Sequence, residues 1–308
     1  MGRAMGKMGW GGWGGWSLVG AVVLASCAPR SPEEPPSAAS LSAEEAQRFV
    51  LELINRDRAA EGLPQLGWDD EAARAGERHA RDMAAHGFTA HWGTDGSVPE
   101  QRYTEAGGDH LVRENAACFF DGQERALEEE PRFDPAELEK IHDAFLSELP
   151  PEDGHRRNLL DPRHSRVGVG LAKPRGVRQP CMAQELVGVF GEYEELASAP
   201  KPHGSLRVAG EVHEPVVFGG VGVKRLPLPK PLSAEELNET STYPVPEPDV
   251  VYFPPGFKTP LPVLVEGRRF EIDVPLGEAG LYAISIWGRF PDAEEQLRIV
   301  SLRTVRVE

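Results

Sequence analysis

The sequence predicts an α+β first part followed by an all-β second part. Three stretches that begin near residues 43, 70 and 135 combine capping residues with apolar side chains at helical spacing, which predicts helices. Two alternating stretches, 165–172 and about 181–190, predict strands. Beyond residue 205, short alternating segments are separated by proline- and glycine-rich turns, and this pattern favours a β-sandwich.

The helix ends carry recognisable signals. Ser42 and Glu45 form a capping box that opens the first helix, and Gly62 stops it. The second helix runs from Asp69 or Asp70 to about His86, and the third opens with Asp134 as its cap and a proline in its first turn. Residues 233–238 predict one further helical turn.

These patterns divide the chain into segments. We expect a signal peptide at 1–26, a Pro/Ser-rich tether at 27–42, a first domain at 43–195, a linker, and a β-domain at 205–308. The expected strands of the β-domain are 206–212, 250–253, 261–265, 270–274, 281–287 and 297–307. The simplest role for this domain is adhesion, spacing or packing against the first domain.

The N-terminus predicts a secreted, lipid-anchored protein. Arg3 and Lys7 precede an apolar stretch that is too short and glycine-rich for a membrane span. It ends in Leu-Ala-Ser-Cys27, which resembles a bacterial lipobox and predicts diacylation of Cys27. The alternative is an ordinary signal peptide cut near the same place. With the anchor, the protein lies in the cell envelope outside the cytoplasm, periplasmic or on the outer-membrane surface, and its partner is the membrane.

Composition excludes one class of partner and leaves one redox question open. The net charge of −16 has no basic patch to offset it, so we expect no nucleic-acid binding. Apart from Cys27, only Cys118 and Cys181 are present. In an oxidising compartment they suggest one disulfide, and the alternative is two separate buried thiols.

Two polar side chains share faces with apolar residues. His79 falls on the inward face of the second helix, so we interpret it as a hydrogen-bonded core histidine. At about 100° per residue, Glu148 falls on the apolar stripe of the third helix with Ile141 and Phe145. A carboxylate there needs a partner, for which His155 is a candidate, unless Glu148 lies at the rim and reaches water.

Several motifs occur in a fixed order between residues 43 and about 193. They are Leu53-Ile-Asn-Arg-Asp-Arg58, His79-Ala-Arg-Asp-Met-Ala84, His91 with Asp95-Gly96, Arg113-Glu-Asn115, Phe145-Leu-Ser-Glu148, Gly154-His-Arg-Arg-Asn-Leu-Leu160 and Val167-Gly-Val-Gly170. This part of the chain resembles the CAP superfamily of cysteine-rich secretory, antigen 5 and pathogenesis-related proteins, in its bacterial secreted branch. The resemblance implies an α-β-α sandwich, also called an SCP domain.

The resemblance also implies a cleft lined by two histidines and two glutamates. The matching residues here are His91, Glu114, Glu148 and His155. Arg113 replaces the glycine of the family's Gly-Glu-Asn motif, and a phenylalanine replaces the usual tryptophan three residues before Glu148.

Two imidazoles with nearby carboxylates can bind Zn²⁺ or another divalent cation, with His91 and His155 as ligands. The alternative is that the four groups satisfy one another and brace the cleft without metal.

Two functions fit this cleft. The first is a ligand-binding or interaction module that takes a small lipid, peptide or glycan. The alternative is a metal-dependent, peptidase-like hydrolase in which a cation-bound water is the nucleophile and Glu114 or Glu148 is the general base. A Ser-His-Asp triad fits poorly, because Ser147 has no base at motif spacing. The sequence therefore leaves open whether the protein is an enzyme.

Overall fold

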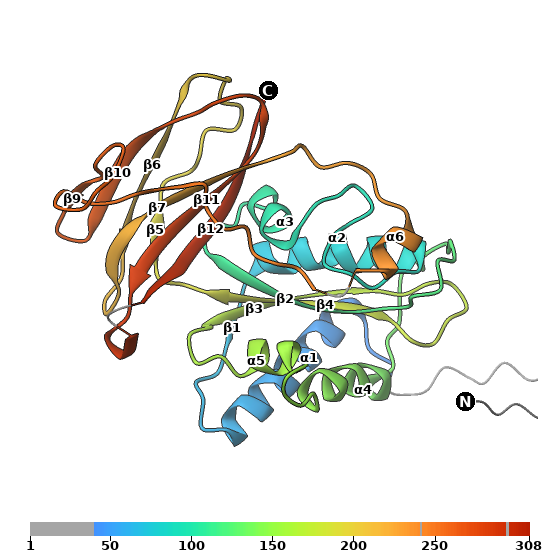
Figure 1. Cartoon of the computed structure of the whole chain (residues 1–308). Helices are drawn as coiled ribbons and strands as arrows, with labels where there is room; N and C mark the ends of the chain where they lie inside the picture. The colour runs from blue at the N-terminus through green and yellow to red at the C-terminus, as the bar shows by residue number, and fades with distance from the viewer. Residues whose placement is uncertain (1–39, 241, 294–295) are drawn as a thin grey trace, which may run out of the picture. The chain divides into compact units, whose positions relative to one another are not determined.

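A computed structural model describes residues 40–240, 242–293 and 296–308 (Figure 1). The predicted signal peptide, Cys27 and most of the tether lie outside the described residues. The described residues all belong to one compact unit. None of the helices in this part of the chain is long and apolar enough to cross a membrane.

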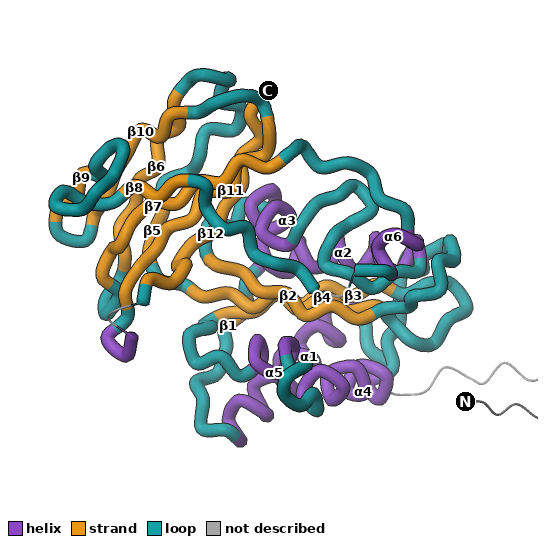
Figure 2. Tube along the Cα trace, in the orientation of Figure 1, coloured by secondary structure: helices purple, strands orange, loops and turns teal. Residues whose placement is uncertain are grey.

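The first part of the chain is a sheet between two layers of helices, as Figures 1 and 2 show. The strand order is β1-β3-β4-β2, with β1 at Gly67–Trp68, β2 at Leu111–Ala117, β3 at Arg166–Ala172 and β4 at Cys181–Gly188. One face is covered by α2 (Asp70–His86) and α3 (Pro99–Glu105), and the other by α1 (Ala43–Ala60), α4 (Pro135–Leu146) and α5 (Gly154–Leu159). The predicted α-β-α sandwich is confirmed.

Local signals place most helix ends correctly. The Ser42–Glu45 capping box is formed, and the Asp69 side chain accepts a hydrogen bond from the backbone of Ala72. Gly87 ends α2 with φ of 69°, a left-handed conformation that glycine adopts without a Cβ clash. The Asp134 side chain caps α4 by accepting a hydrogen bond from the backbone N–H of Ala136.

The prediction for Glu148 as a member of a helical stripe is wrong. Helix α4 ends at Leu146, so Glu148 lies beyond it, and Leu149 is 76% exposed. Proline has no N–H to bond the carbonyl four residues earlier, and its ring clashes with that carbonyl, so Pro150 prevents the helix from continuing past Leu146. Glu148 is partly exposed, which agrees with the alternative that it reaches water.

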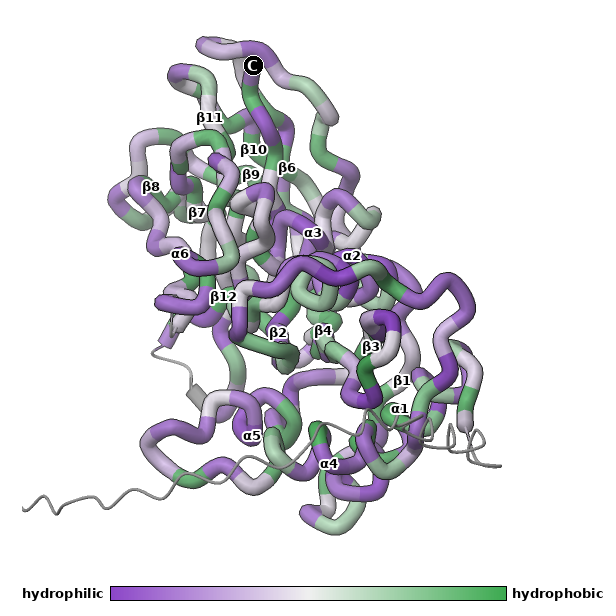
Figure 3. Tube along the Cα trace, turned by 90° about the vertical axis from the view of Figure 1, so that its right-hand side faces the viewer, coloured by the Kyte–Doolittle hydropathy of each residue, from purple (hydrophilic) through white to green (hydrophobic). Residues whose placement is uncertain are grey.

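Strand β2 was not predicted, although it carries Glu114. Covered on both faces by helices, its residues are nearly all buried and show no alternation. In Figure 3, which colours the chain by hydropathy, much of β4 is hydrophobic.

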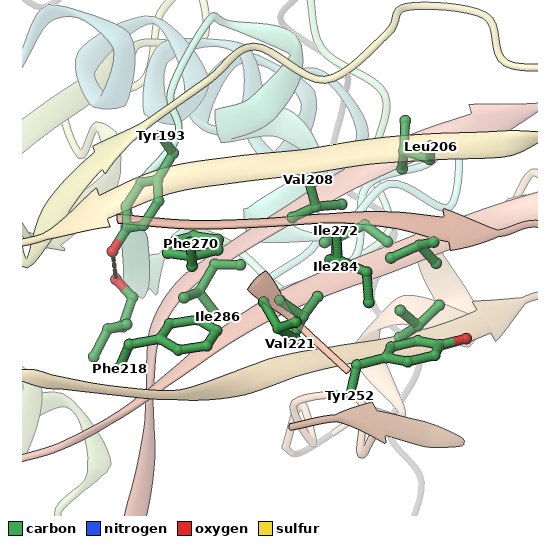
Figure 4. Packing of buried hydrophobic residues seen from close by; sticks show 14 of the residues in the cluster. Tyr193, Leu206, Val208, Phe218, Val221, Tyr252, Phe270, Ile272, Ile284 and Ile286 are labelled. Carbon is green, nitrogen blue, oxygen red and sulfur yellow. Dashed lines mark hydrogen bonds between the residues drawn. The ribbon is translucent and has the colours of Figure 1, made fainter. Parts of the chain in front are cut away.

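The second part of the chain consists of two four-stranded sheets. One has the order β5-β6-β10-β9, from strands Gly191–Tyr193, Ser205–Val212, Arg269–Pro275 and Leu264–Glu266. The other has the order β12-β11-β7-β8, from Leu297–Val307, Gly280–Arg289, Val217–Leu226 and Val250–Tyr252. Figure 4 shows side chains of both sheets, among them Phe218, Phe270 and Ile284, packed in a common core. The predicted all-β sandwich is confirmed.

Two strands of the sandwich differ from expectation. Strand β5 lies inside the range 43–195 expected for the first domain, yet it pairs with β6. Strand β7 was not predicted, because its glycines interrupt the alternation of apolar side chains.

The segment 227–249, which we call the β7–β8 loop, returns to the first part of the chain (Figure 1). It contains the predicted helical turn, α6 (Ala234–Asn238), whose Leu237 is fully buried in a cluster with Met83 and Phe88. The Asn238 side chain accepts a hydrogen bond from the backbone of Thr89 at 3.1 Å and donates one to the carbonyl of Gly87 at 3.2 Å. The loop is therefore bonded to the end of α2.

Candidate functional site

The four predicted site residues form two histidine–carboxylate pairs. His91 Nδ1 lies 2.8 Å from Glu114 Oε1, and His155 Nδ1 lies 2.5 Å from Glu148 Oε1. The backbone N–H of His155 also donates to Glu148 Oε2 at 2.9 Å, so that carboxylate holds its histidine at two points. Glu148 is therefore paired with His155, the partner that the sequence spacing suggested.

Two asparagines join the elements that carry the pairs. Asn158 of α5 donates to the carbonyl of Glu114 at 3.3 Å and to Asn115 Oδ1 at 3.0 Å. Asn115 in turn donates to the carbonyl of His155 at 3.2 Å. Both asparagines lie in the quoted motifs, but their bonding role is visible only in three dimensions. They fix α5 to β2.

Glu114 is a fully buried carboxylate with its own cation. Arg102 of α3, only 2% exposed, donates to Glu114 Oε2 at 2.6 Å and also bonds the carbonyls of Ser97 and His91. Burial opposes ionisation of Glu114, but the neighbouring positive groups outweigh it and hold its pKa well below the usual value. No pattern in the sequence indicates this role of Arg102.

His79 is the buried core histidine that the helix pattern predicts. Its Nε2 donates to the carbonyl of Ala90 at 2.7 Å and lies 3.6 Å from Glu114 Oε1. Burial lowers the pKa of His79 to about 4, so the ring is neutral at pH 7. Arg102 therefore supplies the lasting positive charge beside Glu114.

A cavity of about 420 Å³ opens beside the first pair. Its lining residues are His91, Pro99, Glu100, Val112, Arg113, Glu114, Gly154, Arg157, Asn158, Asp161, Arg163, Tyr243 and Val245. Strand β2, helix α5 and the β7–β8 loop thus each contribute a wall. The lining includes His91 and Glu114 but neither Glu148 nor His155, so the second pair does not line this cavity.

Comparison with known proteins shows which family the first part of the chain matches. The model of the CAP family, described as the cysteine-rich secretory protein family, matches residues 51–185. The chain carries a CAP domain. No curated protein matches the chain.

Three solved structures show similarity to it. An extracellular protein containing an SCP domain from Bacillus anthracis str. Ames is 20% identical, with a TM-score of 0.37, over 47% of this chain and 41% of its own. An outer surface protein of Borrelia burgdorferi is 17% identical, with a TM-score of 0.34, over 48% of this chain and 97% of its own. The PmoD soluble domain from Methylocystis sp. ATCC 49242 (Rockwell) is 10% identical, with a TM-score of 0.24, over 46% and 90%. The chain therefore spans 41% of the length of the Bacillus protein.

The fit of the CAP domain to a divalent cation is incomplete. In both pairs a carboxylate contacts Nδ1, which is how proteins orient histidines that bind metal through Nε2. A protein zinc site normally needs at least three such ligands. Among the described residues, no group of three or more His, Cys, Asp or Glu side chains could hold a metal ion. A cation held by His91 and His155 therefore stays a prediction.

The remaining two cysteines form a disulfide. Cys118, just after β2, is bonded to Cys181, the first residue of β4, with their Cα atoms 4.4 Å apart. The bond ties together two adjacent strands, one of which carries Glu114.

Glu185 is a buried acid that sequence analysis missed. It lies opposite Glu114 in the register of β2 and β4, is 0% exposed, and receives no hydrogen bond to its carboxylate oxygens from the described residues. Burial raises its pKa well above the usual value, and the negative charge of Glu114 adds to the shift. The signal available in the sequence was an acid in the middle of the apolar strand 181–188.

Replacing Glu185 by glutamine should make stability more sensitive to acid. Burial lowers the pKa of both His79 and His164 to about 4, so each takes up a proton on unfolding below its unfolded pKa of about 6.5. Glu185, whose pKa is raised, releases a proton on unfolding above about pH 4.3 and partly cancels that uptake.

Between about pH 4.3 and 6.5, wild-type stability should therefore fall with falling pH, and Glu185→Gln should fall more steeply, by about 1.4 kcal/mol per pH unit. As pH rises above about 4.3, the wild type loses the stabilising contribution of protonated Glu185, and the variant does not. Urea unfolding at a series of pH values measures both slopes. Equal slopes in the two proteins would contradict the assignment.

Proposed function

We propose that the protein is a lipid-anchored component of the cell envelope whose CAP domain acts as a ligand-binding or interaction module. The observation that carries this proposal is the cavity of about 420 Å³ beside His91 and Glu114. Its size lies in the range of small-molecule sites in proteins. None of its described lining side chains is a serine, threonine or cysteine, so it offers no hydroxyl or thiol nucleophile of those types.

The polar groups of the cavity are fixed before any ligand arrives. Arg102 holds Glu114, Glu114 holds the His91 ring, and Asn158 bonds the backbone of Glu114. Groups that are already oriented lose little freedom on binding, which favours affinity. This rigid arrangement supports recognition of a small lipid, a peptide or a glycan.

The proposed location rests on the N-terminal segment and agrees with the cysteine chemistry. The Cys118–Cys181 disulfide is typical of proteins that leave the cytoplasm. Acylation of Cys27 would make the membrane a partner, with two or more acyl chains needed for stable attachment.

A second candidate is a metal-dependent, peptidase-like hydrolase. The Nδ1 contacts of His91 and His155 favour it, because they orient both rings as metal ligands are oriented. In that mechanism Glu114 or Glu148 would position or deprotonate a water on the cation. Glu114, held by Arg102, has a lowered pKa and is a weak base, so Glu148 is the better candidate.

Binding measurements on the purified protein test the first proposal. We expect at least one member of a panel of lipids, peptides and glycans to bind saturably, and His91→Ala to weaken binding at least tenfold by removing a cavity wall. His86→Ala is the matched control, because His86 is a surface histidine paired with Glu124. Absence of saturable binding, or equal binding by both variants, would refute the module. Hydrolysis of panel peptides only with added Zn²⁺, abolished by His91→Ala, would favour the enzyme instead.

A further inference from the structure

Arg113 is a cation in the cavity without a counter-ion. It lies on β2 next to Glu114, is partly buried, and lines the cavity. No described carboxylate forms an ion pair with its guanidinium, and no described acceptor takes a hydrogen bond from it. Burial lowers the pKa of Arg113, but an arginine remains charged at neutral pH.

The nearby acids are engaged elsewhere. Asp161 receives two side-chain hydrogen bonds from Arg163, each 2.8 Å long, and Glu100 accepts a hydrogen bond from the Tyr243 hydroxyl. Glu114 is held by Arg102 and His91. Burial also raises the pKa of Glu100, which weakens it as a competing anion.

A second wall of the cavity carries further positive charge. Arg157 of α5 also lines the cavity, and its side chain is 70% exposed, so it can turn towards an incoming anion at the cost of its ion pair with Asp153. A guanidinium presents parallel N–H groups that match the two oxygens of a carboxylate or phosphate. Removing such a partly desolvated charge from water is unfavourable unless a partner compensates for it.

From this geometry we propose that the cavity of the CAP domain binds an oxyanionic ligand, a carboxylate or a phosphate, with Arg113 as its direct contact. The inference rests on the proposed binding function and narrows it, because neutral lipids and neutral glycans are then excluded as the ligand. Arg113 stands where the resembled family has glycine, so this contact is a property of this chain.

Titration with inorganic phosphate and with acetate tests the inference on the whole purified protein. The readout is the shift of the backbone N–H resonances of the cavity residues Glu114 and Asn158 in ¹⁵N-labelled protein, which are present in the wild type and in every variant. Affinity is fitted from that shift. We expect saturable binding of one anion at least, weakened about tenfold or more in Arg113→Gln and less in Arg113→Lys, which keeps the charge but loses the planar fork. Whichever anion binds more tightly identifies the phosphate or the carboxylate as the recognised group.

Arg74→Gln is the matched control, since Arg74 is an exposed arginine of α2 paired with Glu71. Its affinity should equal that of the wild type. The Arg113 side chain makes no hydrogen bond within the described residues, and its charge is partly desolvated, so its variants should unfold at or above the wild-type temperature, which circular dichroism verifies. No shift with either anion, or equal affinity in Arg113→Gln and wild type, would overturn the inference. A neutral ligand that still depends on His91 would then leave the broader binding proposal standing.

Discussion

Replacing Glu114 by glutamine should destabilise the protein by about 3–5 kcal/mol, the range found when one partner of a buried ion pair is removed. The variant leaves Arg102, which is 2% exposed, without its carboxylate and frees the His91 ring. Glu148→Gln is the matched control, because it breaks the other histidine pair where both side chains are partly exposed. That control should cost about 1 kcal/mol or less. Urea unfolding measures both, and similar losses in the two variants would contradict the account.

A double variant that also replaces Glu185 tests whether the two buried acids, Glu114 and Glu185, are coupled. In Glu114→Gln the negative charge that disfavours ionisation of Glu185 is gone, and Glu185 can ionise near Arg102. The ionised Glu185 then restores part of the stability that Glu114→Gln loses, because it supplies Arg102 with a negative charge. Glu185→Gln alone should have a small effect at neutral pH, but the double variant should lose more than the sum of the two single losses, by about 0.5–3 kcal/mol. Additive losses would show that the two acids are not coupled.

Replacing Gly170 by alanine should cost about 3 kcal/mol or prevent folding altogether, because it forces α2 away from the sheet. A Cβ at Gly170 would lie 1.9 Å from the carbonyl carbon of Gly76 and 2.1 Å from the backbone nitrogen of Glu77. These are backbone atoms of α2, so no side-chain rotation relieves the clash.

Gly67→Ala is the control for this effect, since its Cβ would meet its nearest neighbour at an ordinary 3.9 Å in the same sheet. Thermal unfolding should show a large drop for Gly170→Ala and little change for Gly67→Ala. An unchanged midpoint for Gly170→Ala would mean that helix and strand are not packed at backbone contact.

The sequence was most informative where the physics is local or the motifs are long. Caps at Ser42, Asp134 and Gly87 depend on residues a few positions apart, and they fixed the helix ends. The pairing of Glu148 with His155 also follows from short spacing, although Glu148 lies beyond the end of the helix whose apolar stripe it was expected to share.

What could not be predicted depends on contacts between distant residues. Arg102 reaches Glu114 across elements, and Glu185 faces Glu114 only because β2 and β4 pair in one register. Tyr243 enters the cavity from a loop more than 100 residues away in sequence. Strands β2 and β7 escaped detection since burial on both faces and glycine content remove the period-two signal.

The β7–β8 loop has a consequence for how this protein can diversify. Because Tyr243 and Val245 line the cavity, the C-terminal half helps to set the shape of the proposed binding site. Under the proposed binding function, substitutions of Tyr243 or Val245 would change which molecules the cavity accepts, whereas substitutions of Leu237 or Asn238 would disturb the packing of the loop on α2. If binding occurs as proposed, a homologous CAP domain joined to an unrelated second domain would therefore accept different molecules with the same inner residues.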